Sequence, residues 1–293
     1  MNPEQKELII KLKETAKQLN HSPKKREVYN LASRCYTHFG SFNKAKERAG
    51  LEIRNVIVTR FPEKAFSFGK DLAGIGSYLT FDGHIYNTLK GLMYSSKNIG
   101  DLKDFEKLIF NRFKIKGKYH LNSGGSRNQT HKFYVFNKVI CKKLVDIGFP
   151  KGDKTNQKFS VPKWIRNNKE FSREYLRIAF LCEGSMKEKR KNPRIKINLA
   201  KTEEFLEAGI SFMNELKEML NVFGIRTTEC GLCGKRIRKK DNQVSQDIRF
   251  RVITSDNNRF IKEIGWFKWG EANSIPSMGL WACQSNLKHK AMG

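Results

Sequence analysis

Two stretches of similar sequence place the strongest constraint on the fold of this chain. "IGSYLTFDG" (residues 75–83) and "LRIAFLCEG" (residues 176–184) have the same length, read as helices, and end in an acid followed by glycine. The two closing glycines, Gly83 and Gly184, are 101 residues apart. Glycines also stand at positions 74 and 76, and a glycine inside a helix costs about 1 kcal/mol relative to alanine. We therefore expect another element to approach the first helix closely.

The elements around the two stretches follow one order. After the first stretch, strands are expected at 84–87 and 92–96, a helix near 101–113, strands at 118–122 and 131–137, and a helix at 138–147. After the second, we expect a strand at 194–200, a helix at about 203–223, two strands within 226–254 and a helix from 257. Self-similarity of this kind indicates a repeated structural unit. The sequence therefore predicts an α+β fold built from a duplicated αββαββα unit.

The first fifty residues predict a separate small helical module. Leu8, Leu12 and Leu19 recur at helical spacing, and Ser22 followed by Pro23 is typical of the start of a second helix. A third helix is expected from the Ser41 cap to about Gly50. Three short helices rich in lysine and arginine favour a module like a helix-turn-helix. A helical cap on the main domain is the alternative.

The charge balance indicates a polyanionic partner. The chain has 57 Lys and Arg against 29 Asp and Glu, a formal net charge of +28, and such an excess favours nucleic acid. We find no apolar span of 18 residues, no signal peptide and no lipidation motif, so a membrane is not expected. The six cysteines are scattered, which does not indicate a disulfide framework. We therefore expect a cytoplasmic protein.

Two families resemble parts of this chain. "HSPKKREVYN" and "HFGSFNKAKERAGL" resemble the repeat found beside many homing endonucleases, over residues 3–51, which implies an accessory DNA-binding module. The element order and the two acid-glycine helices resemble the LAGLIDADG homing endonuclease family over about residues 66–285. That resemblance implies a pseudo-two-fold molecule with two saddle-forming antiparallel sheets. The expected organisation is a module at 1–55, a first half at 66–150, a linker at 151–169 and a second half at 170–285.

The two motif helices are expected to pack asymmetrically. Gly74 corresponds to Tyr175, and Ser77 corresponds to Ile178, so each pair combines one small and one large residue. Ile178 departs from the family, which usually has glycine or alanine there. A symmetric dimer must repeat the same residue across its axis, whereas this pattern lets a large side chain on one helix fill a gap on the other. We expect the glycines to make room for Tyr175 and Ile178 in a monomeric pseudo-dimer.

The resemblance also implies the catalytic residues. Asp82 and Glu183 match the two acids that bind catalytic Mg²⁺ in the family, a role that Mn²⁺ can also fill. Hard divalent cations held by carboxylates supply what phosphodiester hydrolysis needs: a nucleophilic water and compensation of the phosphate charge. The family also has a basic residue after the third helix of each half. The positions that match are Lys154 and Lys268, with Lys151 and Lys158 close alternatives.

Alternating strands predict the nucleic acid interface. In "RIKINLA", "DIRFRV" and "KYHLN", apolar residues alternate with basic or amide residues, so one face of each sheet should be buried and the other free to read base edges. The expected DNA-binding residues are Lys118, His120, Asn122, Lys132, Arg194, Lys196, Asn198, Arg249 and Arg251. Cys230 and Cys233 have the spacing of a zinc knuckle, with Cys283 and His289 as downstream partners. Such a half-motif within a predicted strand hairpin is usually a tight turn with two small residues, and we do not expect zinc.

Three functions are compatible with these features. The leading hypothesis is a site-specific double-strand DNA endonuclease of the homing type that cuts across the minor groove. The alternative is a non-cleaving nucleic acid-binding protein on the same fold, either a maturase that assists intron RNA or a transcription regulator. A nuclease embedded in an intein is the weakest hypothesis, because "MNPEQ" offers no splicing nucleophile and "LKHKAMG" lacks a His-Asn ending.

Overall fold

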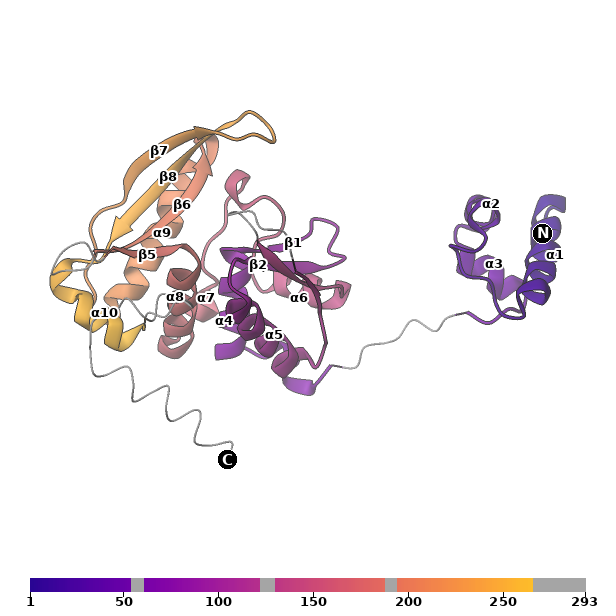
Figure 1. Cartoon of the computed structure of the whole chain (residues 1–293), viewed down its shortest axis with the longest axis horizontal. Coiled ribbons are helices and arrows are strands. Elements are labelled where there is room, and N and C mark those ends of the chain that lie inside the picture. The colour runs from indigo at the N-terminus through magenta and orange to yellow at the C-terminus, as the bar shows by residue number, and fades with distance from the viewer. Residues whose placement is uncertain (54–60, 122–129, 188–193, 266–293) are drawn as a thin grey trace. The chain divides into compact units, whose positions relative to one another are not determined.

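The computed structural model describes residues 1–53, 61–121, 130–187 and 194–265. The chain divides into two compact units, Met1–Arg60 and Phe61–Gly293 (Figure 1). Each unit has a hydrophobic core of its own. The predicted residues Asn122, Lys268, Cys283 and His289 lie outside the described residues.

The N-terminal unit contains α1 (Pro3–Leu19), α2 (Tyr29–Phe39) and α3 (Phe42–Arg48). Leu8, Leu12 and Cys35 are wholly buried in its core. Ser41 caps α3 as expected, because its hydroxyl accepts a hydrogen bond from the Lys44 amide at 3.1 Å. The predicted cap at Ser22 is wrong. Its hydroxyl instead donates to the Glu52 carbonyl at 2.6 Å, and α2 begins seven residues later.

The larger unit repeats one set of elements. The first half runs α4 (Lys70–Thr80), β1 (Gly83–Ile85), β2 (Leu92–Ser96), α5 (Ile99–Phe113), β3 (Lys118–His120), β4 (His131–Val135) and α6 (Lys138–Asp146). The second half runs α8 (Lys169–Glu183), β5 (Gly184–Lys187), β6 (Arg194–Thr202), α9 (Leu206–Asn221), β7 (Gly231–Ile237), β8 (Val244–Arg251) and α10 (Asn257–Glu263). Short helices add η1 (Glu63–Phe66), η2 (Lys154–Asn156), α7 (Lys163–Arg166), η3 (Glu203–Phe205) and η4 (Thr254–Asp256).

Both halves build the same antiparallel sheet. The strand orders are β1-β2-β4-β3 and β5-β6-β8-β7, so in each half the second and fourth strands lie in the middle. Gly83 pairs with Tyr94 in the first sheet, and Gly184 pairs with Ile197 at the corresponding place in the second. The predicted α+β duplication is therefore confirmed.

The two motif helices, α4 and α8, lie side by side between the sheets (Figure 1). A Cβ at Gly74 would lie 3.1 Å from Ile178 Cδ1, so this position has room for glycine and little more. The Ser77 hydroxyl donates a hydrogen bond of 2.7 Å to the Tyr175 carbonyl. Residue 74 thus faces residue 178 while residue 77 faces residue 175, which is the reciprocal pattern that a two-fold axis produces.

Gly76 has a different neighbour from the one expected. A Cβ at this position would lie 1.9 Å from the Phe149 ring rather than against α8. Phe149 is buried and packs edge to face on Trp164, with ring centroids 6.1 Å apart. Gly76 therefore makes room for Phe149, which follows α6, and not for a side chain of α8.

The segment that joins the halves is a packed part of the core. Val161 and Ile165 are wholly buried, and the Val161 amide donates to Glu215 Oε2 on α9 at 2.7 Å. This segment holds the two halves in place as well as connecting them.

Replacing Gly76 by alanine should lower the free energy of unfolding by about 1–3 kcal/mol, because the Phe149 ring must move. This loss should appear although alanine gains roughly 1 kcal/mol in helix propensity. Gly231→Ala is the matched control, since no atom lies within 4 Å of the added Cβ, and its effect should stay within about 0.5 kcal/mol. Urea denaturation measures both. Equal midpoints for Gly76→Ala and the native chain would show that Phe149 does not fill this position.

Candidate active site and nucleic acid interface

The two motif acids lie where the paired helices end. Helix α4 ends at Thr80, so Asp82 stands in the turn before β1, whereas Glu183 is the last residue of α8. Both residues are exposed. A Cβ at Gly83 would lie 2.8 Å from the Tyr78 carbonyl oxygen, so only glycine lets the strand turn away this close to the helix. That glycine fixes Asp82 at the junction.

Cys182 places Asp82 beside the end of α8 that carries Glu183. Burial raises the pKa of the Cys182 thiol well above its usual range, and the Asp82 carboxylate adds to this effect. Cys182 belongs to α8 and Asp82 to the first half, so the two helix ends are close enough for a direct electrostatic effect. The helix crossing therefore brings Asp82 near Glu183, the neighbour of Cys182.

This place attracts cations. The carbonyl end of a helix carries a partial negative charge, and two such ends meet here with two carboxylates. The ammonium group of Lys154 lies in this negatively charged region. Its Nζ donates to the carbonyl oxygens of Leu79 at 3.1 Å and Gly83 at 2.7 Å, and to that of Phe81. All three donors of the ammonium group are thus engaged at the end of α4.

Burial and the nearby carboxylates shift the pKa of Lys154 in opposite directions. Burial lowers the pKa of Lys154 from 10.5 to about 8, while the Asp82 and Glu183 carboxylates oppose that decrease. The competing candidates Lys151 and Lys158 are exposed, and no interaction directs either amine to the acids. Among the described lysines that the sequence proposed, Lys154 is the one beside Asp82.

The two acids suit Mg²⁺ as partial ligands. Mg²⁺ is commonly held by one or two carboxylates, with water and substrate phosphates completing the octahedron. Among the described residues, no three or more His, Cys, Asp or Glu side chains form a metal-binding group. The protein would therefore supply Asp82 and Glu183, and the remaining ligands would come from water and DNA.

The two cysteines with knuckle spacing occupy one edge of the second sheet. Cys233 lies within β7 and Cys230 precedes that strand. The Cys230 thiol lies 3.5 Å from Asn214 Oδ1. The structure brings no described third ligand to them.

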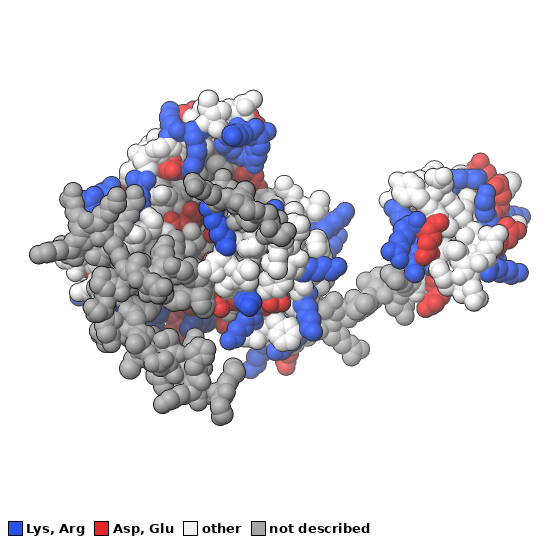
Figure 2. Space-filling model, viewed as in Figure 1, with Lys and Arg blue, Asp and Glu red and all other residues white. Residues whose placement is uncertain are grey.

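The second sheet gathers five of the predicted DNA-binding residues on one face. Lys196 pairs with Arg251 and Asn198 pairs with Arg249 across β6 and β8, and Arg249 Nε donates to Asn198 Oδ1 at 2.7 Å. Arg194 follows the same alternation and is exposed. The intervening residues Ile195, Ile197, Ile248 and Phe250 are buried. Figure 2 shows further Lys and Arg side chains gathered at the β7 and β8 end of this unit.

The first sheet follows the pattern less regularly. Lys132 pairs with His120, and Lys118 pairs with Tyr134, so these side chains occupy neighbouring positions. Tyr119 and Leu121 were expected to be buried, but they are 37% and 53% exposed. Strand β3 has three residues, lies at the edge of its sheet and is exposed along its whole length. Tyr119 instead donates to Glu106 Oε2 at 2.5 Å.

A polar network holds the segment that carries Lys154, and sequence reasoning did not find it. Arg238 and Lys240, in the turn between β7 and β8, donate to Asp153 Oδ2 at 2.5 and 2.7 Å. Burial alone would raise the pKa of Asp153, but hydrogen bonds from Lys240 and Arg238 lower it to about 2. Lys201 Nζ donates to the Lys154 and Gln157 carbonyls, each at 2.6 Å. The partners are more than forty residues apart, so no local pattern signals them.

No helix in the described part of the chain is long and apolar enough to cross a bilayer.

Comparisons with known proteins found similarities to both units of the chain. Residues 3–52 match the family model described as the homing endonuclease associated repeat. Among curated proteins, the chain is 26% identical over 215 residues to the replication factor C small subunit of Methanocaldococcus jannaschii, covering 70% of this chain and 11% of that protein. It is also 26% identical over 231 residues to the tRNA-splicing ligase RtcB of Methanopyrus kandleri, covering 74% and 22%. The chain thus spans between a tenth and a quarter of these relatives' lengths.

Solved structures with a related arrangement include the homing endonuclease I-WcaI bound to its DNA recognition sequence, at 13% identity and a TM-score of 0.47, covering 80% of this chain and 98% of that one. The N-terminal LAGLIDADG domain of DUF199/WhiA matches at 16% identity and a TM-score of 0.43, covering 76% and 97%. The fold assignment itself follows from the repeated strand orders and the paired helices. Residues 3–52 thus match the homing endonuclease associated repeat, and the unit that follows has a duplicated α+β fold with two paired helices and two four-stranded antiparallel sheets.

Proposed function

We propose that this chain is a site-specific double-strand DNA endonuclease of the homing type. The proposal rests on the position of the two motif acids, because Asp82 follows the end of α4, Glu183 ends α8, and these two helices pack against each other. The acids are exposed, both influence the pKa of the half-buried Lys154 and Cys182, and each belongs to one half. Because each half supplies one acid, each acid could serve the cleavage of one strand of a DNA duplex.

The sheets provide the binding surface for this substrate. Lys196, Arg249 and Arg251 share the exposed face of the second sheet, and basic and amide side chains on strands can contact phosphates and read base edges. With one acid-bearing half for each strand, a single chain would bind and cut as a monomer in the cytoplasm. The relatives have different names, and each matches over a small share of its length, as expected of a module carried by several kinds of protein.

Mg²⁺ or Mn²⁺ held by Asp82 and Glu183 would polarise the phosphate and lower the pKa of an attacking water. The chain's own residues do the rest. The carboxylates fix the reaction site at the helix ends, and the basic faces hold the DNA. Lys154 balances the negative end of α4 and thereby holds the turn that carries Asp82.

Asp82→Asn and Glu183→Gln should each lower cleavage at least about 100-fold, because a metal ion contributes several kcal/mol to the transition state. Binding of DNA should stay nearly unchanged. The full chain is incubated with Mg²⁺ and a pool of random-sequence duplexes, and the cut ends are sequenced. Affinity is measured separately by fluorescence anisotropy in EDTA.

Glu170→Gln is the matched control, because Glu170 lies in the first turn of the same helix, α8, at the end opposite Glu183. It should cleave like the native chain. Full cleavage by either acid variant would remove that residue from the mechanism. A native chain that binds duplex DNA but never cuts it would favour the alternative, a maturase for intron RNA or a transcription regulator on the same fold.

Lys154→Met should lower the free energy of unfolding by about 1–3 kcal/mol, because three buried carbonyls lose their donor. Its cleavage should also fall when the variant is assayed well below its melting temperature. Lys158→Met, four residues away and exposed, should change stability by no more than about 0.5 kcal/mol. Thermal melts and cleavage assays measure both. Native cleavage by a destabilised Lys154→Met would limit Lys154 to a structural role.

A further inference from the structure

We propose that α2 is the helix of the N-terminal unit that enters the major groove of DNA, with Arg26 and Arg34 contacting the phosphates beside it. The inference rests on the proposed function only in taking DNA as the partner. It assigns a surface and a binding mode to a unit whose contacts are otherwise undefined.

The exposed face of α2 carries no acid. The helix, "YNLASRCYTHF", contains neither Asp nor Glu, whereas α1 has Glu4, Glu7 and Glu14, and α3 has Glu47. Its exposed residues are Tyr29, Asn30, Ser33, Arg34, Tyr36 and Thr37. At 100° per residue they form one continuous surface of hydrogen-bonding side chains. Asn and Arg are the side chains that most often read adenine and guanine in the major groove.

Two tyrosines on this face are unusually exposed. Tyr29 is 69% and Tyr36 is 65% exposed, and neither side chain makes a hydrogen bond or ring contact with the described residues. They stand seven positions apart, which places them on the same side of the helix. Large aromatic side chains with a free hydroxyl are typical of surfaces that become covered on binding.

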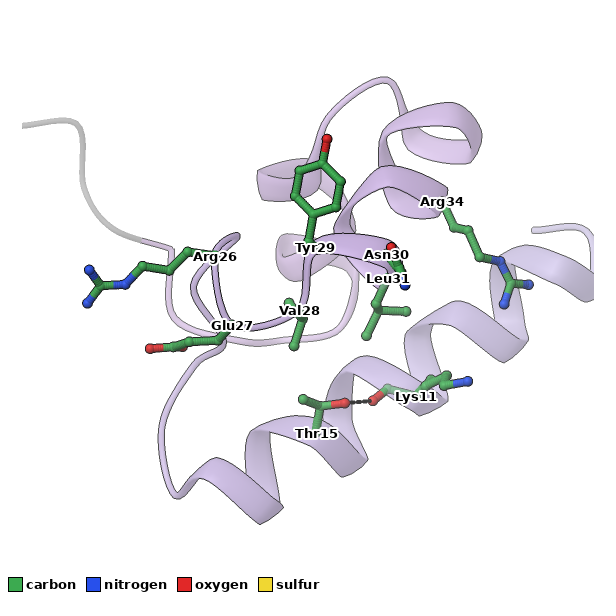
Figure 3. A pocket seen from close by; sticks show the side chains of 9 residues that line it. All are labelled: Lys11, Thr15, Arg26, Glu27, Val28, Tyr29, Asn30, Leu31 and Arg34. Carbon is green, nitrogen blue, oxygen red and sulfur yellow. Dashed lines mark hydrogen bonds between the residues drawn. The ribbon is translucent and has the colours of Figure 1, made fainter.

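A cleft along one flank of this face is lined with cations (Figure 3). It has a volume of about 480 Å³ and lies between α1 and the beginning of α2. Val28 and Leu31 point toward α1 across it, and Arg26 and Arg34 extend at its two ends (Figure 3). The phosphate backbone beside an occupied groove would run along this cleft.

The charges of the cleft leave a positive excess. Lys11, Arg26 and Arg34 line it together with one acid, Glu27. The Glu27 carboxylate accepts from the Lys24 amide at 2.8 Å and lies 3.4 Å from the Lys24 ammonium. Neither Lys11 nor Arg26 uses its side chain in a hydrogen bond or ion pair with the described residues. Arg34 forms an exposed ion pair with Glu7 at 3.6 Å, which contributes little in water. Lys11 and Arg26 therefore offer unused donors to an anion, and Arg34 can exchange its exposed partner for one.

Duplex DNA fits this surface better than duplex RNA. The major groove of B-form DNA is about 12 Å wide and admits an α-helix, whereas the major groove of A-form RNA is too narrow. A helix of 11 residues spans about 16 Å, so its face can cover several base pairs.

The test compares two pairs of substitutions in the full chain. Arg26→Gln with Arg34→Gln removes the cleft cations, and Lys6→Gln with Lys13→Gln removes two exposed cations from the opposite side of α1. Binding to a mixed-sequence 30-base-pair DNA duplex is measured by fluorescence anisotropy in EDTA over a range of KCl concentrations. Each lost phosphate contact lowers the slope of log K against log salt by about 0.9.

The arginine pair should lower the slope by about 1.8, and the lysine pair should leave it unchanged. Tyr29→Ala with Tyr36→Ala should weaken binding without changing the slope, because those contacts are uncharged. Equal effects of the arginine and lysine pairs, native binding by the tyrosine pair, or equal affinity for an RNA duplex of the same sequence would each overturn the proposal. The assay needs no cleavage, so a chain that never cuts DNA would leave this result intact.

Discussion

The contact between α4 and α8 determines where every candidate catalytic group lies. Gly74 leaves room for Ile178, and the Ser77 hydroxyl bonds to the Tyr175 carbonyl. These two contacts are reciprocal across the pseudo-two-fold axis, yet they differ in kind, since one is a packing contact and the other a buried hydrogen bond. A symmetric homodimer could not combine them, because it would repeat the same residue on both sides of its axis. The close crossing then forces the two helix ends, and the acids they carry, to the same place.

Two carboxylates beside two helix C-termini concentrate negative charge in one place. The chain offsets part of this charge with Lys154 and leaves the rest facing solvent. Lys154 places its ammonium group among three carbonyls at the end of α4. The segment that carries it is held by Lys201 from β6 and by the Asp153 contacts with Arg238 and Lys240. The remaining negative charge faces solvent at Asp82 and Glu183, where a divalent cation can balance it. The need to offset negative charge at the helix ends therefore accounts both for the position of Lys154 and for the proposed binding of a divalent cation.

Local patterns were sufficient to predict the repeated elements. Alternating residues such as Ile195 and Ile197 mark a face, and the acid-glycine pairs mark the helix ends, so most of the helices and strands could be placed in order from the sequence. Strand β5 was missed, because its four residues follow the helix directly and show no alternation of their own. The cap at Ser41 followed from local chemistry as well. Ser22 failed because its hydroxyl found a partner thirty residues away, at Glu52.

The rest depended on partners distant in sequence. Nothing near Gly76 indicates that Phe149 fills the space beside it, and nothing near Lys154 indicates that Lys201 holds its carbonyl. The exposure of Leu121 depends on the edge position of β3, which is a property of the whole sheet. The acid-free face of α2 was present in the sequence, but its significance became visible only when the cleft beside it was defined.

The most direct measurement of the central claim is the cleavage of each DNA strand by Ser77→Ile, a variant whose new side chain lies at the helix crossing and not in the site. Ser77 is wholly buried, and overpacking there should separate the helix ends that position Asp82 and Glu183. At a temperature where circular dichroism shows the variant folded, and at saturating DNA, cleavage of both strands should fall together. Cleavage of both strands at the native rate by the folded variant would contradict the account.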